Sequence, residues 1–149
     1  MGLIGAGQRG GITMLHQWVA ADNLRVTAVC DPVKDKALAA QATVERAGKN
    51  TPAVYANGDH DFENLVKRDD VDLVYIAAPW HVHVPAAVAA MEHGKHVLVE
   101  VPAATTIEDC WKLVDTSERT RKHCMIAENV CRDRRPSCTR STGRTPRAC

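Results

Sequence analysis

Short apolar segments alternate with amphipathic segments along the chain, and this pattern predicts six β-strands separated by helices. The strands are expected where apolar and β-branched residues follow one another, at residues 1–4, 25–30, 53–55, 71–78, 96–99 and 124–130. Between them, apolar residues recur at helical intervals in residues 12–19, 37–44, 61–66, 85–93 and 107–114. Strands that alternate with helices predict the α/β class, with a doubly wound parallel sheet covered by helices on both faces.

Several residues mark the expected helix ends. Asp61 is a candidate N-cap for the third helix, and Pro85 is placed at the start of the fourth. Gly94 stands just past the end of that helix, where glycine is favoured. Thr106 begins a capping-box pattern in which Asp109 takes the place of the usual Glu or Gln.

The composition fits one globular domain with a packed core. The 149 residues are 45% hydrophobic and 25% charged with a formal net charge of +1, which excludes a disordered or strongly basic chain. No apolar run approaches the ~18–20 residues of a membrane span, and no signal-like segment precedes the first strand. The six cysteines form no CxxC pair, so free thiols are favoured. We therefore expect a cytoplasmic protein that binds no membrane.

The composition changes abruptly near Cys131. Residues 132–149 hold six Arg, one Asp and no Val, Ile, Leu, Met or aromatic residue, whereas residues 1–131 hold 13 basic and 17 acidic residues. Without apolar side chains to bury, this tail is expected to be disordered, and we interpret it as the product of a frameshift or truncation. Its arginines suit phosphates, but no aromatic residues interleave with them, so nucleic-acid binding is disfavoured.

A GxGxxG sequence at residues 5–10 (GAGQRG) follows the first predicted strand and opens the first predicted helix. In that context it matches the fingerprint of a dinucleotide-binding Rossmann domain, here residues 1–131. Gly5 permits a tight turn, Gly7 lets a pyrophosphate approach the backbone, and Gly10 lets helix and strand pack closely. The helix N-terminus supplies N–H groups and partial positive charge. The alternative is a glycine turn without a ligand.

Asp31 ends the second predicted strand, 26 residues after Gly5. A carboxylate near this position takes the adenosine ribose hydroxyls of a dinucleotide and repels a 2′-phosphate. No Arg at position 32 or 33 offers to pair with such a phosphate. The pattern therefore favours NAD over NADP, with a solvated turn aspartate as the alternative.

Three further segments follow predicted strands at the carboxyl edge of the sheet. Residues 79–83 (PWHVH) follow the fourth strand, where a tryptophan can stack on a cofactor ring and an imidazole can move a proton. Glu100 follows the fifth strand, and Glu128 and Asn129 lie at the end of the sixth. The alternatives are polar contacts at a helix start and carboxylates that merely end strands. His-x-His alone is an incomplete ligand set, so no metal is expected.

With these residues in place, the sequence resembles the Gfo/Idh/MocA family of NAD(P)-dependent sugar oxidoreductases over residues 2–131. The strings that carry the resemblance are GLIGAGQRG, VCDP and DLVYIAAPWHVHVPAAVAAMEHGKHVLVEVPAA. The typical family has a Glu-Lys-Pro tripeptide after the fifth strand, and its Lys is held to assist proton transfer. This chain has Val101 at that position, and a valine side chain moves no proton.

That departure points to a subgroup. PWxxH, EVPAATTIEDCWKLV and TRKHCMIAENVC resemble the family 109 glycoside hydrolases, NAD-dependent enzymes typified by α-N-acetylgalactosaminidase. The resemblance implies NAD as cofactor, a small-molecule sugar substrate and no metal. The NAD contacts it implies are Arg9, Gly10, Asp31, Trp80, His81, Val82, His83, Glu100, Val101 and Asn129.

The implied chemistry is redox-neutral hydrolysis. Bound NAD⁺ removes hydride from sugar C3, and the resulting ketone acidifies the C2 proton. Loss of that proton expels the C1 substituent; water then adds, and NADH returns the hydride. Within this chain, His83 and Glu100 are the catalytic candidates.

Enzymes of this family continue into an α+β domain that binds the substrate, and this chain lacks that domain. We therefore expect the cofactor-binding half of such an enzyme, which binds NAD without turnover. The alternatives are an NAD-dependent sugar or polyol oxidoreductase and a non-catalytic nucleotide-binding fragment. The pattern does not distinguish one oligomeric state from another.

Overall fold

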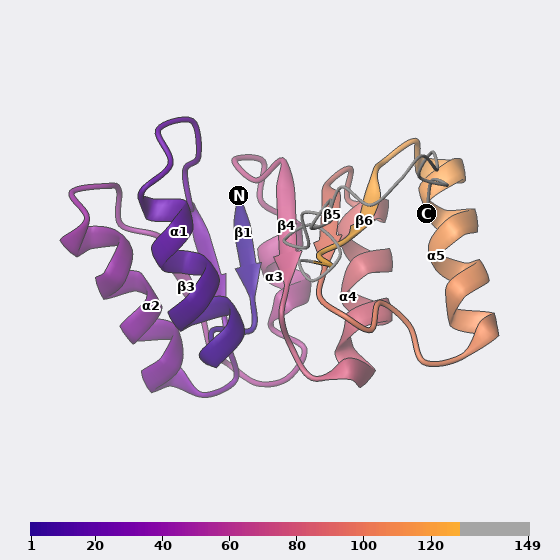
Figure 1. Cartoon of the computed structure of the whole chain (residues 1–149), viewed down its shortest axis with the longest axis horizontal. Helices are drawn as coiled ribbons and strands as arrows, with labels where there is room; N and C mark the ends of the chain where they lie inside the picture. Colours follow the sequence, from indigo (N-terminus) through magenta and orange to yellow (C-terminus); the bar gives the residue numbers. More distant parts are fainter. Residues whose placement is uncertain (129–149) are drawn as a thin grey trace, which may run out of the picture.

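A six-stranded parallel sheet organises the chain (Figure 1). The structure, a computed structural model, describes residues 1–128. The strand order is β3-β2-β1-β4-β5-β6, and all five neighbouring pairs are parallel. The strands are β1 (Gly2–Ile4), β2 (Ala28–Cys30), β3 (Ala53–Tyr55), β4 (Leu73–Ile76), β5 (His96–Val99) and β6 (Cys124–Ile126). The predicted doubly wound α/β fold is confirmed.

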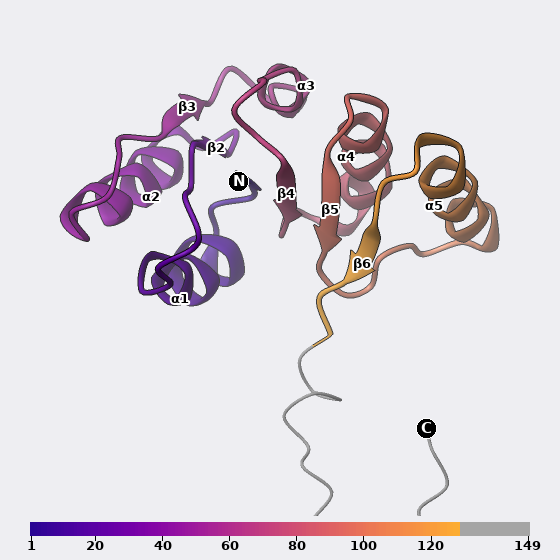
Figure 2. The ribbon, with the colours of Figure 1, turned by 90° about the horizontal axis from the view of Figure 1, so that it is seen from above.

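Helices cover both faces of the sheet (Figure 2). On one face lie a π-helical turn, η1 (Gln8–Met14), and the helices α1 (Leu15–Val19) and α2 (Lys34–Arg46). On the other face lie α3 (Phe62–Val66), α4 (Trp80–Glu92) and α5 (Ile107–Thr120). The first helical segment therefore begins earlier than the predicted residues 12–19, and it begins as a π-helix.

Successive strand residues face opposite cores. Leu3 and Tyr75 are fully buried with Leu15 of α1, whereas Ile4 and Ile76 are buried on the face covered by α3 and α4. Because both faces are covered, the central strands are apolar at nearly every position, as buried parallel strands are. Burial on both faces therefore explains why the strands occur in the sequence as continuous apolar runs.

The strand order reverses at β1, which fixes the position of a crevice. β1 lies between β2 and β4, and the register sets Ile4 level with both Cys30 and Ile76. The carboxyl ends of the three strands therefore meet at one edge, and the chain leaves β1 toward one face and β4 toward the other. Open α/β sheets bind ligands at such a switch point.

Two of the four predicted helix-end residues behave as expected. Gly94 follows α4 with a φ of +77°, and its N–H donates to the Met91 carbonyl oxygen at 2.9 Å. The Thr106 hydroxyl accepts a hydrogen bond from the Asp109 N–H at 3.1 Å, so Thr106 is the N-cap of α5. Both features satisfy backbone groups that a helix end leaves unpaired.

The other two predictions are wrong in detail. Helix α4 begins at Trp80, because Pro79 before it is extended and accepts the Val82 N–H at 2.8 Å; Pro85 therefore lies inside the helix. Asp61 stands at the N-cap position of α3, but its carboxylate makes no cap bond. Its Oδ2 accepts instead from the backbone N–H and the side-chain amide of Asn57, and its Oδ1 accepts from the side-chain amide of Asn64.

Residues 129–149 lie outside the described residues. The predicted tail at 132–149, the domain boundary at residue 131 and the position of Asn129 therefore remain predictions. Across residues 1–128, no helix is both long enough and apolar enough to cross a membrane.

We expect Thr106→Ala to lower the free energy of unfolding by about 1 kcal/mol, because the Asp109 N–H loses its acceptor. Urea unfolding of the whole chain measures the change. Thr106→Ser is the control, since it keeps a hydroxyl at the N-cap. Equal stabilities of the two variants would show that the cap bond does not contribute.

Candidate functional site

The turn after β1 brings the backbone against β4 so closely that side chains are excluded. Gly5 has a φ of +91°, and a Cβ there would lie 2.5 Å from the Ala77 carbonyl oxygen. A Cβ on Gly10 would lie 2.1 Å from the Gly5 carbonyl oxygen. At Gly7, by contrast, no protein atom lies within 4 Å of the Cβ position. The turn is therefore closely packed at Gly5 and Gly10. At Gly7 it is open, next to the first N–H groups of η1.

Asp31 ties the end of β2 to this turn. One oxygen of its carboxylate, Oδ2, accepts from the Ala6 N–H at 2.8 Å, and the other, Oδ1, accepts from the Val33 N–H at 2.9 Å. The residue is only 6% exposed, so its orientation is fixed. Each carboxylate oxygen has two lone pairs, and the bonds to backbone leave acceptor capacity for a hydroxyl in the crevice.

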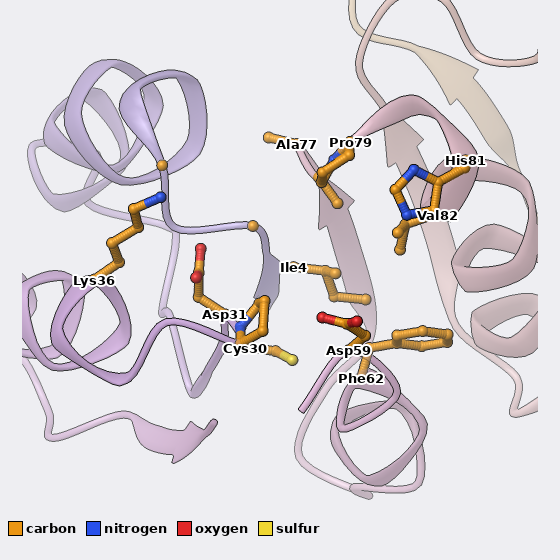
Figure 3. A pocket seen from close by; sticks show the side chains of 14 residues that line it. Ile4, Cys30, Asp31, Lys36, Asp59, Phe62, Ala77, Pro79, His81 and Val82 are labelled. Carbon is orange, nitrogen blue, oxygen red and sulfur yellow. The ribbon is translucent and has the colours of Figure 1, made fainter. Parts of the chain in front are cut away.

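A cavity of about 430 Å³ opens at the switch point, beside the glycine turn and Asp31 (Figure 3). Its walls are mostly apolar, and its polar side chains reach in from different elements: Lys36 from α2, Asp59 from the β3–α3 loop and His81 from α4. The full lining is Ile4, Gly5, Gly7, Cys30, Asp31, Pro32, Lys36, Asp59, Phe62, Ala77, Ala78, Pro79, His81 and Val82.

The structure gathers only part of the predicted site in this cavity. The predicted contacts that line it are Gly5, Gly7, Asp31, His81 and Val82. Gly10 lies beneath the turn and contributes close packing. Trp80 and Val101 are 64% and 43% exposed and do not line the cavity.

Arg9 and Glu100 form a separate site on the α1 face of the sheet. The Arg9 Nε donates to a Glu100 carboxylate oxygen at 2.6 Å, and the Tyr75 hydroxyl donates to the same oxygen. The hydrogen bond to Glu100 raises the pKa of the Arg9 guanidinium, and burial, followed by the bond to Glu100, raises the pKa of the Tyr75 phenol. Trp18 packs its ring edge-on against Tyr75, with centroids 4.5 Å apart. The Arg9–Glu100 ion pair therefore holds the start of η1 against the end of β5.

His83, a catalytic candidate, is 1% exposed and faces backbone. Its two ring nitrogens lie 2.8 Å from the Ala78 and Pro102 carbonyl oxygens. A neutral imidazole donates to one of them and an imidazolium to both. In this arrangement His83 links the turn after β4 to the turn after β5.

Three cavity residues were missed by sequence reasoning: Lys36, Asp59 and Phe62. Asp59 follows β3 in the chain, and a wider search of the carboxyl ends of all strands would have included it. Lys36 lies in the first turn of α2, five residues after Asp31. Phe62, at the start of α3, is 4% exposed and contributes an apolar side chain to the cavity wall.

The geometry fits a dinucleotide. The open backbone at Gly7 and the first N–H groups of η1 suit a pyrophosphate, and the fixed Asp31 carboxylate suits ribose hydroxyls. The apolar walls suit a planar base. Within residues 1–128, no three His, Cys, Asp or Glu side chains are placed together to hold a metal ion.

Comparison with known proteins agrees with this geometry. Residues 1–128 match the sequence profile of the Gfo/Idh/MocA group, described as an oxidoreductase family with an NAD-binding Rossmann fold. A solved structure, the 3-ketoreductase KijD10 from Actinomadura kijaniata in complex with NADP and TDP-benzene, is similar with a TM-score of 0.70 and 28% identity. That match covers 85% of this chain and 36% of KijD10.

Two sequence relatives carry names of glycoside-cleaving proteins. A glycosyl hydrolase family 109 protein from Solibacter usitatus is 53% identical over 133 residues, which are 88% of this chain and 30% of that protein. An alpha-N-acetylgalactosaminidase from Bacteroides fragilis is 44% identical over 133 residues, 89% of this chain and 31% of that enzyme. The chain thus spans less than a third of the length of either relative.

We expect stability to fall with rising pH above about 9 through Cys30, a 3% exposed thiol in the cavity wall. Burial, with smaller effects of Asp61 and Asp31, raises the pKa of Cys30 to about 12 from an ordinary 9.0. Between these values the unfolded thiol ionises and the folded thiol does not, so the free energy of unfolding falls by up to about 1.4 kcal/mol per pH unit.

Urea unfolding at pH 8 to 11 measures this slope. Cys30→Ala should flatten the first part of the fall, whatever it does to stability at pH 8. Tyr75→Phe is the comparison variant, since it keeps the Cys30 contribution and alters the fall only above pH ~10, where the raised pKa of Tyr75 contributes. An unchanged slope in Cys30→Ala contradicts the assignment.

Proposed function

Because the chain belongs to the Gfo/Idh/MocA family of oxidoreductases with an NAD-binding Rossmann fold, we propose that it is the cofactor-binding part of a redox-neutral, NAD-dependent glycosidase of the α-N-acetylgalactosaminidase type. By itself the chain binds NAD without turnover. The observation that carries the cofactor assignment is the Asp31 carboxylate, fixed by two backbone N–H groups beside the open glycine turn. The relatives in family 109, at 44% and 53% identity, support the glycosidase assignment.

The proposed cofactor is NAD rather than NADP. Asp31 cannot rotate away without losing its bonds to Ala6 and Val33, so a ribose 2′-phosphate would face a fixed negative charge. Lys36 lines the cavity together with Asp31, and it also lines a second cavity with Gly7 and Gln8, between η1 and α2. Among residues 1–128 Lys36 forms no ion pair with Asp31, so the charge of that carboxylate is not neutralised.

The proposed role of the remaining site residues is positioning. When bound, NAD would accept a hydride from the sugar and return it later, which permits hydrolysis without net oxidation. Arg9 and Glu100 neutralise one another and fix the start of η1, and His83 fixes the turns after β4 and β5. Val101, where the typical family has a lysine, has no proton to transfer. The substrate-binding groups are proposed to lie in the part of the relatives that this chain does not span.

A sugar oxidoreductase is the second candidate, and the similarity to a 3-ketoreductase favours it. The two functions differ in the fate of the hydride. An oxidoreductase accumulates NADH with each turnover, whereas the proposed glycosidase leaves the amount of NAD⁺ unchanged.

We expect the chain to bind NAD⁺ at least about tenfold more tightly than NADP⁺, a difference of ~1.4 kcal/mol. Asp31→Asn removes the charge and keeps the shape, so it should narrow the ratio of the two dissociation constants several-fold. Isothermal titration calorimetry measures both ligands. Asp35→Asn is the control, because Asp35 is exposed on α2 and does not line the cavity. A ratio unchanged in Asp31→Asn would contradict the assigned role.

The chain is expected to release no p-nitrophenol from p-nitrophenyl α-N-acetylgalactosaminide in the presence of NAD⁺. The same mixture, followed at 340 nm, should accumulate no NADH. The Bacteroides fragilis alpha-N-acetylgalactosaminidase serves as the positive control. Release of p-nitrophenol would show that the chain suffices for catalysis, and NADH formation would favour the oxidoreductase.

A further inference from the structure

Asp59 is a charged residue of the cavity to which the proposed function assigns no role. It lies in the loop between β3 and α3, and its carboxylate points into the cavity (Figure 3). Among residues 1–128 it makes no side-chain hydrogen bond or ion pair, in contrast to Asp31 and Asp61, whose carboxylates accept backbone and amide N–H groups. Its acceptor capacity therefore remains available to a ligand.

We propose that Asp59 recognises the 6-amino group of adenine, and so determines which base the cavity accepts. The inference rests on the proposed NAD binding. With the pyrophosphate at Gly7 and the adenosine ribose at Asp31, the base continues into the part of the cavity beyond Asp31. Ile4, Cys30, Phe62 and Val82 give that part apolar walls, which suit the faces of a purine.

The polar groups on this side of the cavity differ in what they can discriminate. A carboxylate only accepts hydrogen bonds, whereas an imidazole can donate or accept. Asp59 therefore favours a base with a donor at position 6, and His81 tolerates either kind of base. Adenine carries an amino group at that position. Guanine and hypoxanthine carry a carbonyl oxygen, which would face the negative charge with no proton between them.

The discrimination should be substantial, because a base that covers the exposed Asp59 carboxylate displaces its water and must replace the lost hydrogen bond with an N–H group of its own. A hydrogen bond to a charged group contributes more than a neutral one, and a site that binds an N–H group rejects an analogue without it. We expect NAD⁺ to bind at least about tenfold more tightly than nicotinamide hypoxanthine dinucleotide, in which a carbonyl replaces the 6-amino group.

Calorimetric titration of the whole chain with these two dinucleotides tests the proposal. In Asp59→Asn the side-chain amide can donate to the hypoxanthine carbonyl or accept from the adenine amine, so the preference should shrink to within about threefold. Asp59→Ala should lose the preference through weaker NAD⁺ binding. Asp69→Asn, an exposed aspartate outside the cavity, is the matched control and should retain the full preference.

The outcomes separate this inference from the proposed function. If the wild-type chain binds both dinucleotides equally, or if Asp59→Asn keeps the wild-type preference, Asp59 does not determine which base is bound. Either result leaves the proposed NAD binding unaffected. If the wild-type chain binds neither dinucleotide, the proposed function and the inference are both overturned. Thermal unfolding of each variant, with Asp69→Asn as reference, verifies that a lost preference does not arise from a lost fold.

Discussion

The contact between the glycine turn and the end of β4 is the constraint on which the site depends. The Gly5 Cβ position is 2.5 Å from the Ala77 carbonyl oxygen, so only a residue without a side chain can bring β1 and the start of η1 this close to β4. The switch point of the sheet lies at this contact, and the crevice opens above it. Any residue larger than glycine at position 5 would move the η1 N-terminus and, with it, the surface that faces a phosphate.

Two carboxylates hold the turn from opposite sides. Asp31, at the end of β2, accepts the Ala6 N–H, while Glu100, at the end of β5, accepts from Arg9 on the first turn of η1. Both are more than 90% buried, and both accept hydrogen bonds, as buried charges must. The turn is therefore fixed before any ligand arrives, and a ligand need not order it on binding.

The sequence was sufficient for the doubly wound parallel sheet, because buried parallel strands leave apolar runs and strands that alternate with helices pair in parallel. It was also sufficient for the glycine turn and Asp31, whose spacing reflects a recurring backbone geometry. It was insufficient for the hydrogen-bond partners of individual side chains. The Asp61 carboxylate, for example, accepts from Asn57 and Asn64 and makes no cap bond to α3. Asp59 and Lys36 were missed because loop length and helix phase, not spacing, direct them into the cavity.

The division of labour in the proposed enzyme follows from where its groups lie. The phosphate-facing turn, the ribose carboxylate and the base cavity all come from β1 to β4 and the segments that follow them, so the cavity proposed for the dinucleotide lies within residues 1–128. The candidates for chemistry are different, because Glu100 is neutralised by Arg9 and His83 faces two carbonyl oxygens. Neither has a free proton-transfer partner at the cavity. In the proposed enzyme, the groups that position and deprotonate a sugar would therefore lie in the part of the relatives that this chain does not span.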